Sequence, residues 1–169
     1  WVRTTVHQNL LLRWVRDEAV YDVWQRLCEL GLGDAGADEI TDVVSCPGTD
    51  SCKLGITASM GVKQVLQQRI EEMKITDPLT KQIHIKLSGC PNGCSRPFLA
   101  EIGLVGRSPG RYNLYLGAAF DGSRLNKLYR QDLGHEEIVA ALTPLLEAYA
   151  RERNAQERFG DFVIRKGVV

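Results

Sequence analysis

Four of the five cysteines fall in two closely spaced pairs. Cys46 and Cys52 form a C-x5-C motif in SCPGTDSC, and Cys90 and Cys94 form a C-x3-C motif in GCPNGC. In each pair a proline follows the first cysteine directly, and a glycine lies within the turn. Each pair also follows a segment that we expect to be a strand. Two loops that present thiols at the ends of strands can converge on one metal centre.

Four thiolates suit either a zinc ion or an iron–sulfur cluster. Structural zinc sites mostly take each pair of cysteines from a C-x2-C or C-x4-C turn, so spacings of five and three fit the larger cluster better. Glycines also let backbone N–H groups approach the sulfur atoms of a cluster. Unligated or redox-active thiols are the third alternative. Catalytic nucleophiles are not favoured, because neither pair has a nearby histidine to act as a base.

The length and composition exclude several other classes of protein. The 169 residues correspond to one domain, or to one domain with a piece of a neighbour. Lysine plus arginine and aspartate plus glutamate both number 21, so we expect no binding to nucleic acid or to a membrane surface. An odd number of cysteines indicates a reducing compartment, the cytoplasm or, in a plant or alga, the plastid. We interpret the opening WVRTTVHQNLLLRWV as part of a longer polypeptide.

The hydrophobic periodicity predicts strands and helices around the two loops. The expected strands are residues 2–15 (bent at 7–9), 40–46, 82–88, 99–106, 111–117 and 159–169. The expected helices are residues 17–30, 62–73 and 135–153. Cys28 is expected to be a small buried hydrophobe in the first helix. Pro144 predicts a kink or two shorter helices in the last. The fold class is α+β, a mixed sheet with flanking helices.

The stretches around the two cysteine pairs carry a family resemblance. SCPGTDSCKLGIT, followed by IHIKLSGCPNGCSRPFLAEIGLVGRSPGRYNLYLG, resembles the cluster-binding region of the sulfite and nitrite reductases. These hemoproteins carry siroheme and a [4Fe–4S] cluster. TTVHQNLLL resembles the closing strand of their ferredoxin-like half, and ERFGDFVIRKGVV is similar to a segment near their end. The resemblance implies that residues 1–36 close the ferredoxin-like half and that residues 37–169 form the cluster- and siroheme-binding domain.

The resemblance also implies roles for individual residues. Four ligands would each bind one iron of the cluster: Cys46, Cys52, Cys90 and Cys94. Cys94 would in addition bridge to the siroheme iron as its axial ligand, which makes it the catalytic residue. Arg96 is expected to bind a siroheme carboxylate, with Lys53 and Lys86 as further basic candidates. Asn92 is a candidate cofactor contact, although Pro-Asn-Gly is also an ordinary turn sequence.

The activity implied by the resemblance is the six-electron reduction of sulfite to sulfide or of nitrite to ammonia. The electron donor would be a ferredoxin or a flavoprotein subunit. The long match from GCPNGC through GRYNLYLG is closer to assimilatory sulfite reductases, whereas CPGTDSCKLGIT is nearer to the nitrite reductases. We therefore expect a sulfite reductase, with nitrite reduction as the alternative. A module that only transfers electrons through the cluster remains a further alternative.

Overall fold

Two compact units, residues 1–37 and 38–169, make up the computed structural model, which describes all of residues 1–169. The smaller unit begins with β1 (Val2–Thr4) and β2 (Leu10–Leu12), which pair antiparallel. The turn between them is closed by the Thr5 N–H, which donates to the Asn9 carbonyl oxygen at 2.8 Å. The expected bent strand is therefore a short hairpin. The 3-10 turn η1 (Asp17–Ala19) and helix α1 (Val20–Glu29) follow it.

The apolar residues of the smaller unit are exposed. Trp14 is 78% exposed and Trp24 47%, and no residue of α1 is buried. Cys28 is also exposed, so the expectation of a small buried hydrophobe is wrong. The reason is size, because a hairpin and one helix are too small to enclose a core of their own.

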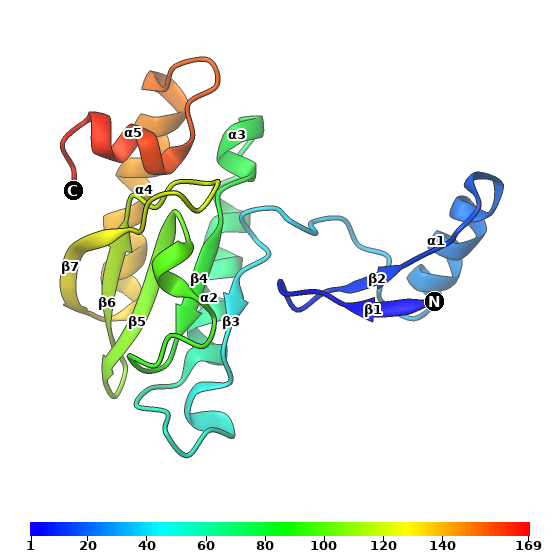
Figure 1. The fold of residues 1–169 in the computed structure, drawn as a ribbon, viewed down its shortest axis with the longest axis horizontal. Helices are drawn as coiled ribbons and strands as arrows, with labels where there is room; N and C mark the ends of the chain where they lie inside the picture. The colour runs from blue at the N-terminus through cyan, green and yellow to red at the C-terminus, as the bar shows by residue number, and fades with distance from the viewer. The chain divides into compact units, whose positions relative to one another are not determined.

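The larger unit is built on a five-stranded mixed sheet in the order β3-β4-β5-β6-β7 (Figure 1). Its strands are β3 (Val44–Ser45), β4 (Ile85–Ser88), β5 (Ile102–Ser108), β6 (Arg111–Leu116) and β7 (Lys127–Leu133). The first three strands run parallel, and the last two continue antiparallel. The prediction of an α+β fold with a mixed sheet and flanking helices is confirmed.

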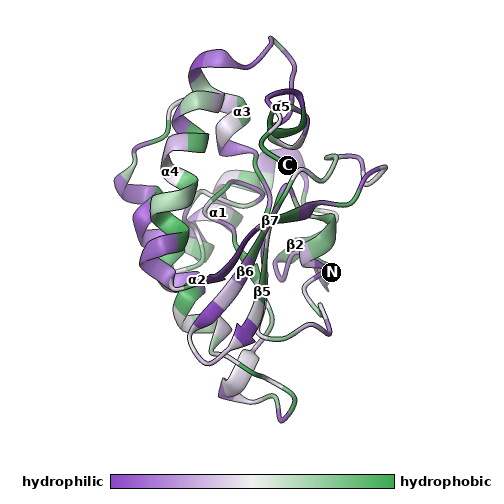
Figure 2. Cartoon of the chain, turned by 90° about the vertical axis from the view of Figure 1, so that its left-hand side faces the viewer, coloured by the Kyte–Doolittle hydropathy of each residue, from purple (hydrophilic) through white to green (hydrophobic).

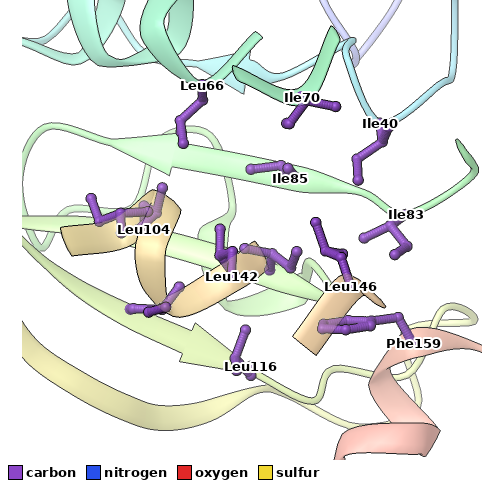
Figure 3. Close-up of a cluster of buried hydrophobic side chains, with 14 of the residues drawn as sticks. Ile40, Leu66, Ile70, Ile83, Ile85, Leu104, Leu116, Leu142, Leu146 and Phe159 are labelled. Carbon is purple, nitrogen blue, oxygen red and sulfur yellow. The ribbon is translucent and has the colours of Figure 1, made fainter. Parts of the chain in front are cut away.

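One face of this sheet carries the hydrophobic core. Helices α2 (Ser59–Glu72) and α4 (His135–Glu152) lie against it, with the hydrophobic side of α4 toward the sheet (Figure 2). The core also includes residues of α5 (Phe159–Arg165), whereas the short α3 (Pro78–Lys81) precedes β4. Figure 3 shows how the core side chains from the helices and strands meet: Ile40, Leu66, Ile70, Ile83, Ile85, Leu104, Leu116, Leu142, Leu146 and Phe159.

The opposite face of the sheet is covered by the 3-10 turn η3 (Pro97–Leu99), which packs on β4 and β5. A side chain at Gly103 would collide with the Pro97 carbonyl oxygen, so only glycine allows η3 to lie this close to β5. The buried Asn126 side chain donates to the carbonyl oxygens of Pro97 at 2.8 Å and Ala100 at 2.9 Å. These contacts hold the segment that follows the second cysteine pair.

The segment 159–169 was predicted as a strand, and this prediction is wrong, because Phe159–Arg165 is the helix α5. Phe159, Phe162 and Val163 are buried, and their spacing of three and four residues is helical. Gly160 explains the tight docking of α5, since a side chain there would collide with the Ala118 carbonyl oxygen.

Two further elements differ from the sequence-based expectations. Helix α4 is one helix with Pro144 inside it, so the alternative of two shorter helices is wrong. Buried residues on both sides of the proline, among them Leu142 and Leu146, keep the helix against the sheet. Strand β7 was not predicted, because it is an edge strand with mostly exposed side chains and no apolar alternation. No helix of the chain is both long and apolar enough to cross a lipid bilayer.

Candidate metal centre

The two cysteine loops leave the sheet from neighbouring parallel strands. Cys46 follows β3 directly, and Cys90 comes two residues after β4. Ser45 and Leu87 are register partners, and the Cys46 N–H donates to the Leu87 carbonyl oxygen at 3.1 Å. Parallel strands end at the same edge of a sheet, so both loops start from that edge (Figure 1). The expectation that each pair of thiols follows a strand is confirmed.

Hydrogen bonds join the two loops directly. The N–H groups of Ile56 and Thr57, beyond the first pair of cysteines, both donate to the Gly89 carbonyl oxygen at 3.1 Å. The Gly89 N–H in turn donates to Cys46 Sγ at 3.1 Å. Gly89 thus binds both ends of the first loop while preceding the first cysteine of the second.

Glycines make this close contact possible. A Cβ at Gly89 would lie 2.5 Å from Ser59 Oγ and 2.7 Å from the Thr57 carbonyl oxygen. A Cβ at Gly48 would lie 2.6 Å from Ser59 Oγ, and Gly48 also has a φ of +57°. Neither position has space for a side chain, so the close approach of the two loops requires glycine at both Gly48 and Gly89.

Helix α2 begins where the first loop ends. Its first residue, Ser59, is fully buried, and its Oγ lies 3.5 Å from Cys46 Sγ. Thr57 fixes the same stretch to β6, because its hydroxyl donates to Tyr112 Oη at 3.1 Å while Tyr112 Oη donates to the Ala58 carbonyl oxygen. Burial is the main cause that raises the pKa of Tyr112, which keeps the phenol a neutral donor.

The second loop is closed by its own hydrogen bonds. Ser88 Oγ and Ser95 Oγ lie 2.7 Å apart, and Ser88 Oγ also accepts from the Ser95 N–H at 3.2 Å. The Arg96 N–H donates to the Gly93 carbonyl oxygen at 2.7 Å. Arg96 itself has a φ of +59°, a left-handed conformation that costs a residue with a side chain on the order of 1 kcal/mol. The backbone is therefore bent sharply immediately after Cys94.

The four cysteines differ in how far they are buried. All four are free thiols in the structure. Cys90 is 7% exposed, Cys46 and Cys52 are half-buried, and Cys94 is exposed. The four cysteines therefore range from the buried Cys90 to the exposed Cys94.

The arrangement does not fit a single metal ion. No three histidine, cysteine, aspartate or glutamate side chains are grouped so that they could hold one ion. Four sulfurs around a zinc ion would lie roughly 4 Å apart. A cubane cluster is held by four thiolates, so the chemistry of the donor set, four cysteines on two loops, fits a cluster.

The other predicted cofactor contacts lie beside the second loop. Asn92 and Arg96 are both exposed. Lys86 is only 9% exposed and pairs in register with Gly103, so its side chain lies on the face covered by η3. Burial, with the positive charge of Arg96 as a second cause, lowers the pKa of Lys86. The cationic side chains of Lys86 and Arg96 therefore lie close together beside the second loop. Lys53, directly after the first loop, is exposed.

Sequence reasoning did not find Ser59 and Gly89 as contacts of Cys46. A serine at the start of a helix is an ordinary capping residue, so its side-chain partner is not visible in the sequence. Gly89 carries a stronger signal, since a glycine directly before a cysteine ligand offers an N–H that can approach closely.

Comparison with known proteins identifies the class. The family model described as "Nitrite and sulphite reductase 4Fe-4S domain" matches residues 36–169, so the chain belongs to this family. A "Sulfite reductase [NADPH] hemoprotein beta-component" of Bacillus pumilus is 44% identical over 170 residues, which cover 99% of this chain and 30% of that protein. A protein of the same name from Methylobacterium sp. is 45% identical over 168 residues, covering 99% and 28%. The chain thus spans less than a third of the length of these relatives.

The fold is shared with a solved structure of the Mycobacterium tuberculosis NirA protein. The TM-score is 0.77, with 24% sequence identity over 97% of this chain and 32% of that one. At this identity the likeness concerns the fold. It agrees with the mixed sheet and helices described above.

Proposed function

We propose that the loops at residues 46–52 and 90–94 hold a [4Fe–4S] cluster through Cys46, Cys52, Cys90 and Cys94. The observation that carries the proposal is the direct joining of the two loops, in which the Gly89 N–H donates to Cys46 Sγ and the Gly89 carbonyl oxygen accepts from the first loop. Membership in a 4Fe-4S domain family supports this ligand set. The donor set of four free thiols also fits the cluster.

We further propose that Cys94 is the ligand shared with a siroheme iron. The exposure of Cys94 supports this assignment, because a shared sulfur must be accessible to both the cluster and the siroheme. Bound together, the cluster and siroheme supply the electron pathway to a small oxyanion. The chain itself would contribute the sulfur of Cys94 and the charges of Arg96 and Lys86. These cations suit siroheme carboxylates, because a guanidinium and a buried ammonium are strong hydrogen-bond donors to carboxylate oxygens.

The proposed reaction is the six-electron reduction of sulfite to sulfide by the longer protein to which this chain corresponds. The names of the relatives, which specify sulfite and NADPH, support sulfite as substrate and an NADPH-dependent flavoprotein as electron donor. Nitrite remains the alternative substrate and ferredoxin the alternative donor, because the first cysteine motif resembles the nitrite reductases. A reducing compartment such as the cytoplasm suits the free thiols.

Steady-state turnover tests this proposal. The full-length protein, expressed in a host that makes siroheme, is supplied with reduced methyl viologen and either sulfite or nitrite. We expect sulfide to form, with a larger kcat/KM for sulfite than for nitrite. A larger kcat/KM for nitrite would assign the protein to the alternative. A protein that contains the cluster and siroheme but reduces neither anion would contradict the proposed activity.

A further inference from the structure

Two hydrogen-bonding groups lie against the sulfur of Cys46. Cys46 Sγ lies 3.1 Å from the Gly89 nitrogen and 3.5 Å from Ser59 Oγ. A thiolate bound to iron has no proton, so in that state Ser59 must be the donor of its pair. Cys46 would then accept two hydrogen bonds from this chain.

Both donors are held in place and shielded from water. The relative exposure of Ser59 is 0%, and Gly89 is buried. Ser59 Oγ lies against the backbone of two glycines, because a Cβ would come within 2.6 Å of it at Gly48 and within 2.5 Å at Gly89. Ser59 also starts the 14-residue helix α2, whose positive N-terminal end therefore faces the same sulfur.

Hydrogen bonds to a ligand sulfur favour the reduced cluster. Reduction adds one electron from the donor, with no bond broken and no proton moved, and part of the added negative charge resides on the cysteine sulfurs. A donor pointed at one of these sulfurs stabilises the more negative state and so raises the reduction potential. The effect is largest where water is excluded.

We infer that Ser59 is a positioning residue that, together with the Gly89 N–H, raises the reduction potential of the cluster through Cys46. This inference rests on the proposed cluster ligation. It assigns to Ser59 a role that depends on its hydroxyl and on no contact with substrate.

The test is a potentiometric titration of Ser59→Ala in the full-length protein with its cluster, followed by electron paramagnetic resonance. We expect a reduction potential more negative than that of the wild type. Ser45→Ala is the matched control, because Ser45 is equally buried beside Cys46 but its Oγ donates to the Cys46 carbonyl oxygen at 2.9 Å. The control should keep the wild-type potential. An unchanged potential in a cluster-containing Ser59→Ala variant would overturn the inference.

A measurement on the wild type covers the case in which Ser59→Ala fails to assemble a cluster. Electron–nuclear double resonance of the reduced cluster should show exchangeable protons that disappear in D2O, from the Ser59 hydroxyl and the Gly89 N–H. A spectrum without exchangeable protons would refute the inference. Iron and sulfide analysis separates the two proposals, because a wild-type protein without a cluster would refute the ligation itself.

Discussion

The Gly89 N–H donates to Cys46 Sγ across 3.1 Å, although 43 positions separate the two residues in the chain. The contact exists because Cys46 and Gly89 follow the neighbouring parallel strands β3 and β4 at the same edge of the sheet. Gly89 has no side chain to keep Cys46 away, and its carbonyl oxygen binds the far end of the same loop. One glycine thus joins the two cysteine motifs.

Gly89→Ala should separate the loops and lower the cluster content. The new Cβ would lie 2.5 Å from Ser59 Oγ and 2.7 Å from the Thr57 carbonyl oxygen, and both atoms are buried. We expect at least a several-fold loss of iron and acid-labile sulfide per chain. Gly61→Ala is the control, because a Cβ at Gly61 in α2 meets nothing within 4 Å and alanine favours a helix by up to about 1 kcal/mol. Equal cluster content in both variants would refute the steric role of Gly89.

Serine substitution at three of the proposed ligands should abolish the cluster. Cys46→Ser, Cys52→Ser and Cys90→Ser each replace a soft thiolate by a hydroxyl, which is a poor ligand for iron. The absorption of the cluster and its iron and sulfide should be lost in each variant. Cys28→Ser should keep them, because Cys28 lies in the unit of residues 1–37, outside both cysteine motifs. Retention of a full cluster by any of the first three variants would remove that cysteine from the ligand set.

Cys94→Ser should affect both cofactors. Cys94 is exposed, and we propose that its sulfur is shared between the cluster and the siroheme iron. Loss of this sulfur should therefore shift the siroheme absorption bands in addition to reducing cluster content. The spectrum of Cys90→Ser serves as the comparison, because Cys90 is only 7% exposed. If bound siroheme has an unaltered spectrum in Cys94→Ser, Cys94 is not its axial ligand.

Asp77 should make the folded protein sensitive to acid. Its carboxylate accepts from Arg153 Nη2 at 2.7 Å and from the Thr80 N–H at 2.8 Å, where it caps α3. The hydrogen bond from Arg153 is the main cause that lowers the pKa of Asp77 to about 2. The unfolded chain has a pKa of about 3.9, so this stabilisation is present above about pH 4 and is lost as the pH falls toward 2.

Asp77→Asn should therefore lower the free energy of unfolding at pH 7 by about 1 to 2 kcal/mol, a value reduced for solvent screening. Between pH 4 and 2 its stability should fall less steeply than that of the wild type. Urea unfolding of the apoprotein, followed by circular dichroism at several pH values, measures both effects. Glu147→Gln, at an exposed position of α4, should change the stability by less than about 0.5 kcal/mol. Parallel pH curves for Asp77→Asn and the wild type would contradict the assignment.

The sequence predicted the elements with strong periodicity and the residues with unusual chemistry. Strand β6 and helix α4 were predicted because their buried residues recur at regular intervals, and β5 because it is a continuous apolar run. The convergence of the cysteine loops was also expected, since each pair follows a strand. Strand β7 was missed because an edge strand needs no apolar face, and its pairing with β6 is decided by tertiary contacts.

The errors have local physical causes. The segment starting at Phe159 is rich in apolar residues and was read as a strand, although the spacing of Phe159, Phe162 and Val163 is helical. Its docking depends on the absent side chain of Gly160 at the Ala118 carbonyl oxygen, and a contact across 42 positions leaves no mark in a local pattern. The same holds for Ser59, whose contact with Cys46 arises only after the loop has closed.

Metal analysis of the full-length protein tests the central claim most directly. The protein is produced in a host that makes siroheme, and its iron, zinc and acid-labile sulfide are determined together with its absorption spectrum. Ligation of a cluster by the four cysteines, with siroheme bound at Cys94, predicts about five irons per chain, four in the cluster and one in the heme, and about four sulfides. A zinc-containing or colourless protein with four free thiols would contradict it.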